Sequence, residues 1–242
     1  MIHSIKGGWY FVHVPKNAGT SILHPYYGRG TDLELKRRRV ARRKRDGIGR
    51  HPWDTPLKHP DGENPWTTER HHNKATFWQP YFDSLRPVAI LRNPWARCLS
   101  LYLFNTKEAA NRVNKEEWAK WDHPRLVREG FKASWMPGGF FVDGHSKEIE
   151  YSKKTGRAWG QGDDQFSWLG DGKTGKPMKG AKWFRLEDQL DEFCKFTGLS
   201  IPRKSNTTTH GAWRTYYDDE LVERIGKIFA RDVKLGGYTP PP

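Results

Sequence analysis

The stretch Tyr10–Ile22 constrains the fold of this chain more than any other part of the sequence. It begins with the aromatic and β-branched run Tyr10–Val14, which is typical of a buried strand. Pro15 ends that run, and a Thr-Ser pair a few residues later favours the start of a helix. The helix dipole and the N–H groups of a helix N-terminus attract an anion. The stretch therefore predicts a phosphate-binding turn, with Lys16 adding a positive charge.

The order of Lys and Gly in this turn differs from that of the nucleotide triphosphatase loop, in which Gly, four residues and Gly-Lys precede Ser or Thr. Here Lys16 comes three positions before Gly19, and Gly7 and Gly8 lie too far upstream to complete the pattern. A kinase or nucleotide hydrolase is therefore disfavoured. A plain strand-to-helix connection is the simplest alternative for a short turn of this composition.

A second strand followed by a helix is expected further along the chain. Residues 87–91 form a continuous apolar run, as in a parallel strand that is covered on both faces. Asn93 can cap a helix, and Pro94 suits the first helical position. The helix is expected to continue to about Ala110.

Polar side chains around the start of this second helix suit a phosphate. Arg92 closes the strand and offers a fork of donors, while Ser100 adds a hydroxyl. Arg97 and Ser100 lie three residues apart and share a helical face, so we expect both to point back towards Arg92. The alternative is an Arg that ends a strand and a Ser on an exposed helix face.

These motifs resemble those of sulfotransferases that use 3′-phosphoadenosine 5′-phosphosulfate (PAPS). Residues 15–21 resemble the family's 5′-phosphosulfate loop, Pro-Lys-x-x-Gly-Thr-Ser, and residues 92–102 match its 3′-phosphate motif, Arg-Asp/Asn-Pro-x-x-Arg-x-x-Ser-x-Tyr. Two motifs in this order, about 75 residues apart, are more specific than either alone. Residues 183–188 resemble the family's Arg-Phe-Glu segment, which leads from a strand into a helix. Asn206 lies where a Pro-x-x-Asn segment is usual in the family. Residues 216–238 look like the closing helix of carbohydrate-type members.

The resemblance implies transfer of a sulfuryl group from PAPS to a hydroxyl acceptor, with a carbohydrate expected. It implies that the cofactor-binding residues are Lys16, Asn17, Ala18, Gly19, Thr20, Ser21, Arg92, Ser100 and Arg185. Lys16 is also expected to act in catalysis. The family places a His base between the two motifs, which indicates His72, although sequence does not separate it from His71. Other members use a carboxylate, which keeps Glu69 as a further candidate.

The order of elements predicts an α/β fold in which ligands bind at the carboxyl ends of parallel strands. The resemblance implies a P-loop nucleotide-binding-like arrangement, with a parallel sheet flanked by helices in a single sulfotransferase domain over residues 1–242. Residues 28–65 and 111–165 match no motif and are expected to be acceptor-side insertions. Two more helices are expected, over 116–128 with an interruption at Pro124 and over 187–197 with Gly198 as its end.

The chain carries a formal net charge of +14, which suggests a polyanionic partner. Residues 36–45 hold eight cations and no acid. Asp32 to about Arg45 is expected to be either a helix or a solvated arm, and it is a candidate for capturing an anionic glycan acceptor. The alternative function is nucleic-acid binding through this segment, but no nucleic-acid motif appears, so nucleic acid is not the expected partner.

Cysteine usage and hydropathy exclude several other classes. Cys98 and Cys194 are the only cysteines and lack metal-binding spacing, so we expect neither a disulfide framework nor a bound metal. No stretch approaches the roughly 18 apolar residues of a membrane-spanning helix, and no apolar signal core is apparent at the N-terminus. We therefore expect a cytoplasmic protein.

Overall fold

The structure is a computed structural model. It describes residues 2–27, 33–48, 74–112, 123–137, 139, 141–142, 164–171, 174, 176–200 and 212–241. The chain separates into two compact units. The first comprises Met1–Leu91, Gly156–Ala158 and Gln165–Thr207, and the second comprises Arg92–Thr155, Trp159–Asp164 and Thr208–Pro242.

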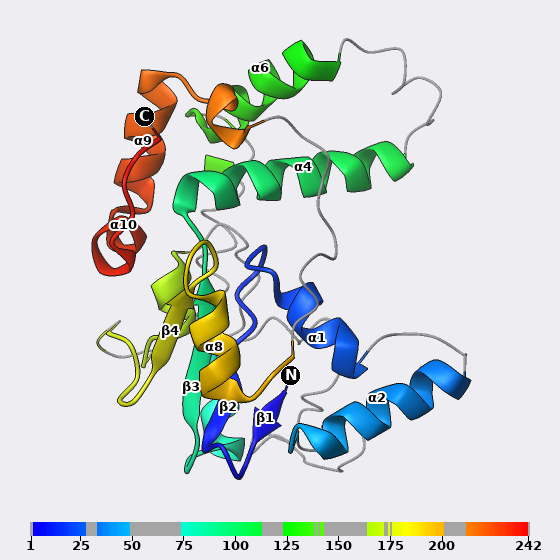
Figure 1. The fold of residues 1–242 in the computed structure, drawn as a ribbon. Helices are drawn as coiled ribbons and strands as arrows, with labels where there is room; N and C mark the ends of the chain where they lie inside the picture. Colours follow the sequence, from blue (N-terminus) through cyan, green and yellow to red (C-terminus); the bar gives the residue numbers. More distant parts are fainter. Residues whose placement is uncertain are drawn as a thin grey trace. The chain divides into compact units, whose positions relative to one another are not determined.

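The first unit contains a four-stranded sheet (Figure 1). Its strands, in spatial order, are β1 (His3–Ser4), β2 (Trp9–Phe11), β3 (Arg86–Leu91) and β4 (Lys182–Arg185). β2, β3 and β4 are parallel, whereas β1 pairs with β2 in the antiparallel direction. The expected α/β fold with a largely parallel sheet is therefore confirmed, with an antiparallel edge strand that was not predicted.

One face of the sheet is covered by helices α1 (Gly19–Tyr27) and α8 (Leu190–Thr197). Trp9 and Phe11 of β2 point to this face and are fully buried with Ile22 of α1. Figure 1 shows α8 lying against the strands. This packing explains why the strand run in the sequence is apolar at successive positions instead of alternating.

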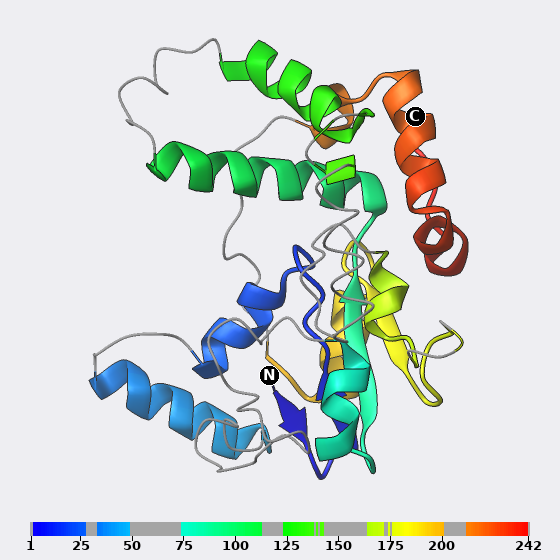
Figure 2. The same ribbon diagram turned by 180° about the vertical axis from the view of Figure 1, so that it is seen from behind.

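The opposite face is covered by shorter elements, α3 (Ala75–Trp78) and the 3₁₀ helix η5 (Gln165–Trp168). Tyr10 and Val12, which alternate with the residues of the first face, are buried among them. Figure 2 views this unit from behind. Both faces of the sheet are therefore dry, so the edge at which the parallel strands end is the natural place for a ligand.

The basic segment forms helix α2 (Leu33–Arg45), close to the expected bounds. The Tyr26 hydroxyl of α1 donates to the Asp46 carboxylate, 2.8 Å away, just beyond the end of α2. Ile48 is buried against the same side of the sheet as α1. These contacts anchor α2 to the first unit, so the helical alternative is the one the structure contains.

The described part of the second unit is helical. Its elements are α4 (Pro94–Arg112), α6 (His123–Trp135), η6 (Trp213–Tyr216), α9 (Asp219–Ile228) and α10 (Ala230–Gly236). Fully buried side chains from α4, α6 and α9, among them Leu99, Phe131, Trp135, Leu221 and Ile225, form its core. α4 follows β3 directly and matches the predicted helix, extending to Arg112.

The helix expected over 116–128 overlaps the described helix α6, which begins at His123 and continues to Trp135. Pro124 lies in the first turn of α6. Proline is tolerated there because the first N–H groups of a helix have no intrahelical acceptor. A prediction for residues 116–122 falls outside the described part of the chain.

Two other expectations concern helix ends. Gly198 ends α8 as predicted, with a left-handed φ of +71° that glycine adopts without steric cost. The expected closing helix is instead two helices, α9 and α10, separated at Phe229. Phe229 is buried in the core of the second unit, which explains the break in an otherwise helical segment.

Candidate functional site

The loop between β2 and α1 starts at the carboxyl edge of the sheet. The N–H of Val12 donates to the carbonyl of Val88, 2.7 Å away, which continues the parallel pairing one residue past β2. The chain then leaves the sheet at Val14 and Pro15 and enters α1 at Gly19. The predicted phosphate-binding turn is therefore placed where parallel α/β sheets bind ligands.

The backbone of this loop alternates in conformation. Lys16 and Ala18 have φ angles of +65° and +60°, whereas Asn17 and Gly19 lie outside the left-handed region. For residues with a Cβ, the left-handed conformation costs about 1–2 kcal/mol. Where right-handed and left-handed residues alternate, successive N–H groups turn towards one side and can form a concave site for an anion. Strain of this size persists only where surrounding contacts impose it.

The N-terminus of α1 adds donors to the same loop. At this end, the N–H of Ile22 donates to the carbonyl of Ala18, 3.1 Å away, which is a helical hydrogen bond. The N–H groups of Gly19, Thr20 and Ser21 therefore precede the intrahelical ladder. Ala18 carries only a methyl group and has no side-chain oxygen with which to cap them. The dipole of a nine-residue helix also favours negative charge at this end.

The φ angle of Gly19 is not left-handed, so its backbone conformation does not require glycine. Glycine is required here because another side chain comes very close. A Cβ at this position would lie 1.8 Å from both Cδ2 and Nε2 of His13. The His13 ring is almost completely buried and stacks on Phe11, with 6.3 Å between the ring centroids. The last residues of the strand region and the first residue of α1 are thus packed directly on each other.

Asn17 ties the loop to two other segments of the first unit. Its Nδ2 donates to the backbone carbonyl of Ile90 in β3, 2.8 Å away, and to Oε1 of Gln165 in η5, 2.5 Å away. Only 1 % of Asn17 is exposed. A side chain so placed does not present itself to a ligand, so the predicted cofactor-binding role of Asn17 is left to its backbone.

Arg185, another predicted cofactor-binding residue, ends β4 at the same edge of the sheet. Leu91 of β3 is its partner in the register. Two strand spacings separate β2 from β4, which is about 10 Å. The Arg185 guanidinium pairs with both oxygens of Asp188, with Nε to Oδ1 at 2.9 Å and Nη2 to Oδ2 at 2.6 Å. Arg185 therefore lies in the same unit as the loop, already paired with a carboxylate.

The second predicted motif begins the second unit. Arg92 is half-buried directly after β3, and Ser100 is half-buried on α4. Asn93 caps α4 as predicted: its Oδ1 accepts from the N–H groups of Trp95 and Ala96, at 3.1 and 3.4 Å.

Arg97 is buried inside the second unit, with 1 % exposed. Its guanidinium carbon lies 5.9 Å from the centroid of the Phe229 ring. The sequence predicts that Arg97 and Ser100 share a helical face and point back towards Arg92. The position of Arg97 beside Phe229 allows its cation to interact with an aromatic face within the helical core.

The candidate bases His71, His72 and Glu69 lie outside the described residues, and so does Asn206. Conversely, sequence reasoning missed three residues that shape the site: His13 beneath Gly19, Gln165 beside Asn17 and Asp188 against Arg185. Asp188 was within reach of sequence reasoning because it lies three residues after Arg185. Gln165 was not, because 148 positions separate it from Asn17.

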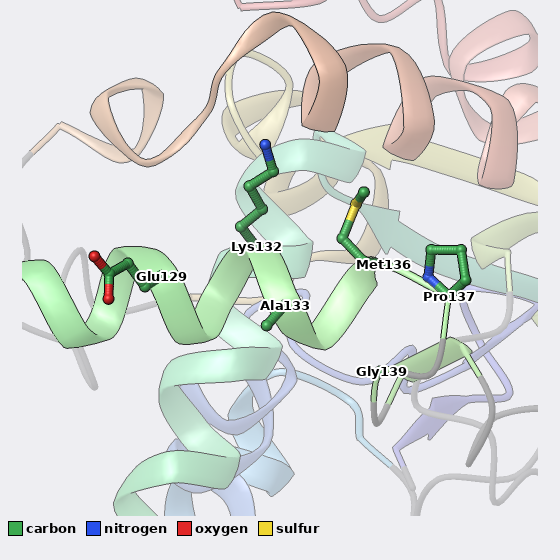
Figure 3. A pocket seen from close by; sticks show the side chains of 6 residues that line it. All are labelled: Glu129, Lys132, Ala133, Met136, Pro137 and Gly139. Carbon is green, nitrogen blue, oxygen red and sulfur yellow. The ribbon is translucent and has the colours of Figure 1, made fainter.

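A hollow of about 590 Å³ lies elsewhere, at the C-terminal end of α6 in the second unit (Figure 3). Its lining residues are Glu129, Lys132, Ala133, Met136, Pro137 and Gly139. The Lys132 amino group lies 2.8 Å from Asp218 Oδ2 and 2.7 Å from Glu220 Oε2, and these hydrogen bonds raise the pKa of Lys132 to about 12. No residue predicted from sequence lines this hollow, and its cation is already neutralised.

Comparison with protein-family models, with curated proteins and with solved structures gave no match for this chain. Within the described ranges, no three His, Cys, Asp or Glu side chains gather into a metal site. No helix in the part of the chain that the structure describes is long and apolar enough to span a membrane.

Proposed function

We propose that this protein is a PAPS-dependent sulfotransferase with a P-loop-like phosphate cradle, and that its acceptor is a hydroxyl group of a carbohydrate. The observation that carries the proposal is the β2–α1 loop. It combines alternating φ angles, a Lys and a helix N-terminus at the carboxyl edge of a parallel sheet. Each of these features favours an anion, and their sequence is the one that resembles the family's 5′-phosphosulfate loop.

In this proposal the acceptor oxygen forms a bond to sulfur while the bond between sulfur and the bridging phosphate oxygen breaks. The acceptor proton passes to a base, and 3′-phosphoadenosine 5′-phosphate leaves with the electron pair. Lys16 and the N–H groups of Ala18 to Ser21 stabilise the charge that develops on the leaving phosphate. As in phosphoryl transfer, catalysis comes from alignment and charge stabilisation.

The other predicted residues take roles that follow from their chemistry. Arg92 and Ser100 bind the 3′-phosphate, since Arg offers paired donors and Ser a hydroxyl. Arg185 contributes a further cation once its pairing with Asp188 is exchanged for a ligand anion. His72 is the proposed base, and His71 and Glu69 are the alternatives. The single substitutions His72→Ala, His71→Ala and Glu69→Gln would separate them.

Ligand binding tests the cofactor assignment before any acceptor is known. At about 100 times its dissociation constant, 3′-phosphoadenosine 5′-phosphate should stabilise the protein by about 2.7 kcal/mol in thermal unfolding. AMP and ATP should stabilise it less, because Arg92 and Ser100 then have no 3′-phosphate to bind. Equal stabilisation by AMP would overturn the 3′-phosphate assignment. Transfer of label from PAPS to a panel of hydroxyl acceptors then tests the activity itself.

Nucleic-acid binding is a second candidate, favoured by one observation. α2 is a formed helix with eight cations in ten residues, of which Arg37, Arg38, Lys44 and Arg45 are exposed. Such a face suits the phosphate backbone of a nucleic acid. Nucleic-acid binding, however, leaves the β2–α1 loop without a role. A salt titration of DNA binding, set beside binding of 3′-phosphoadenosine 5′-phosphate, separates the two candidates.

A further inference from the structure

The side chain of Asn17 is arranged in an unusual way for a buried amide. Both donors of Nδ2 are used, on the Ile90 carbonyl and on Gln165 Oε1. Its Oδ1 is buried and has no hydrogen-bond partner among the residues that the structure describes. An unsatisfied buried acceptor is unfavourable, so stability alone would favour a side chain without that oxygen. Donation by Nδ2 is therefore the property that requires an amide at this position.

The two residues beside Asn17 are those with left-handed backbone. Lys16 and Ala18 each hold a conformation that other contacts must impose, because neither is glycine. Asn17 lies between them, and its amide is bonded to the main chain of β3, a buried strand in the middle of the sheet. A second hydrogen bond from the same amide joins it to Gln165 of η5, which is far from β3 in the sequence. Two bonds to rigid partners determine how the peptide groups on both sides of Asn17 are oriented.

We infer that Asn17 is the positioning residue of the β2–α1 loop. By holding the segment from Lys16 to Gly19 against β3 and η5, it turns the N–H groups of the loop and of the first turn of α1 towards an anion. It does not touch the anion itself. The identity of that anion as the 5′-phosphosulfate of PAPS rests on the proposed function, whereas the positioning role does not.

Three variants of the full chain separate positioning from ordinary stabilisation. Asn17→Asp has nearly the same shape but no donor at neutral pH, and Asn17→Ala removes the whole amide. The matched control is Thr197→Val in α8, which removes a buried hydroxyl that donates to the Phe193 carbonyl at 2.7 Å in the same unit. All three lose a buried hydrogen bond, but only the Asn17 variants lose one from the loop.

The first measurement needs no ligand. In hydrogen exchange, the amides of residues 16–22 should exchange at least tenfold faster in both Asn17 variants than in wild type, relative to amides of β3. In Thr197→Val that ratio should stay at the wild-type value even though the whole protein is less stable. Gln165→Ala removes one of the two acceptors and should give a smaller increase of the same kind. If the Asn17 variants raise exchange no more than Thr197→Val does, the positioning role is wrong.

The second measurement uses inorganic sulfate, which stays a dianion from pH 4 to 8. Asn17→Asp should bind sulfate at least tenfold more weakly than wild type at pH 7 and recover part of the loss towards pH 4, because a protonated carboxyl regains a donor. Asn17→Ala should show no such recovery. Sulfate affinity that is unchanged in both variants would contradict the inference. Wild-type protein that binds sulfate but does not prefer 3′-phosphoadenosine 5′-phosphate over AMP would instead sink the proposed function and leave Asn17 in its role.

Discussion

The two strand-to-helix junctions of this protein differ in how their helices begin. At the start of α4, Asn93 accepts from the N–H groups of Trp95 and Ala96 and so satisfies them internally. At the start of α1, the preceding residue is Ala18, which has no side-chain acceptor, and the Oδ1 of the neighbouring Asn17 makes no hydrogen bond within the described structure. The start of α4 is therefore the capped junction, and the start of α1, which receives no cap from the side chain of Asn17 or Ala18, is called the uncapped junction.

This difference separates two ways of binding a phosphate. A capped helix end has used its backbone donors, so any anion there must be bound by side chains, as we propose for Arg92 and Ser100. An uncapped end can bind through the backbone, provided that the loop is held in shape. The left-handed φ angles of Lys16 and Ala18 define that shape, and the buried amide of Asn17, bonded to Ile90, is the feature that holds it.

The largest effect is expected from Lys16→Gly, which removes the charge of the uncapped junction but keeps its backbone. Turnover should fall by about two to three orders of magnitude, as when one charge-stabilising donor is lost. The free energy of unfolding should stay within about 1 kcal/mol of wild type, because glycine relieves the left-handed strain at φ +65°. Steady-state kinetics and urea unfolding check the two parts. An active Lys16→Gly enzyme would show that the backbone alone supplies the catalysis.

Gly19→Ala tests the close packing beneath the same junction. The added Cβ would meet the His13 ring at 1.8 Å, so the loop or the ring must move. We expect a loss of about 1–3 kcal/mol in unfolding free energy, the usual effect of overpacking, together with weaker sulfate binding. Gly226→Ala in α9 is the control, since its Cβ would lie 3.3 Å from the Trp95 ring. Equal stability of the two variants would contradict the packing argument.

Asn93→Ala opens the capped junction. Loss of the cap should reduce the unfolding free energy by about 1 kcal/mol, while Asn93→Asp, which keeps an acceptor, should be close to wild type. Denaturant unfolding of the full chain measures both. If Asp and Ala are equally destabilising, the Asn93 contacts at 3.1 and 3.4 Å do not act as a cap.

A smaller effect is expected from α2, which is anchored to the helix of the uncapped junction. Replacing Arg37, Arg38, Arg42 and Arg43 with Gln should raise the Michaelis constant for an anionic acceptor about threefold at low salt, since a positive field concentrates the substrate. The salt dependence should shrink, with turnover and PAPS affinity unchanged. A charge-matched control changes four exposed lysines of the first unit to Gln: Lys6, Lys176, Lys179 and Lys195. If both sets act alike, only net charge matters and α2 has no specific role.

The smallest effect concerns a second capped helix in the second unit. Asp218 caps α9 by accepting from the N–H of Leu221 at 2.9 Å. The pKa of Asp218 is lowered from the usual 3.8, mainly by the hydrogen bond from Lys132 and next by the one from Leu221. A lowered folded-state pKa means that this carboxylate stabilises the fold above pH 3.8 and that the contribution is lost as pH falls through the lowered value. Asp218→Asn keeps the cap, so at pH 7 it should lower the free energy of unfolding by less than Asn93→Ala does. The difference in unfolding free energy between Asp218→Asn and wild type should disappear on acidification. A difference that is constant with pH would exclude an ionic contribution of Asp218.

Strands β2 and β3 of the first unit and the helix start that follows β3 could be predicted because their signals are local. The apolar runs before Pro15 and Arg92 predict buried parallel strands, and the structure contains them as β2 and β3 with their continuation at Val12. Asn93 and Pro94 predict a helix start because a cap and its N–H groups lie within three residues. The same is true of Gly198, whose left-handed turn depends on its own backbone.

The local signals were weaker in the second unit. The helix predicted over 116–128 ends before α6 does, and Pro124, the predicted interruption, lies in the first turn of α6. The break between α9 and α10 is set by the burial of Phe229 among residues from α4 and α6. Arg97 is buried beside Phe229, and its helical spacing from Ser100 could not reveal this burial because spacing does not tell which face the core covers.

By itself, the sequence determined the strand-loop-helix order, the Lys at the turn, the helix start at Asn93 and the excess of positive charge, since each depends on neighbours a few residues away. Only the tertiary structure decided that Gly19 packs on His13, that Arg185 is paired with Asp188 at the same sheet edge, and that Asn17 is bonded to Ile90 and Gln165, 73 and 148 positions away. Which buried donor meets which acceptor across such separations depends on how β3 and η5 pack around the loop, and no local periodicity records that packing.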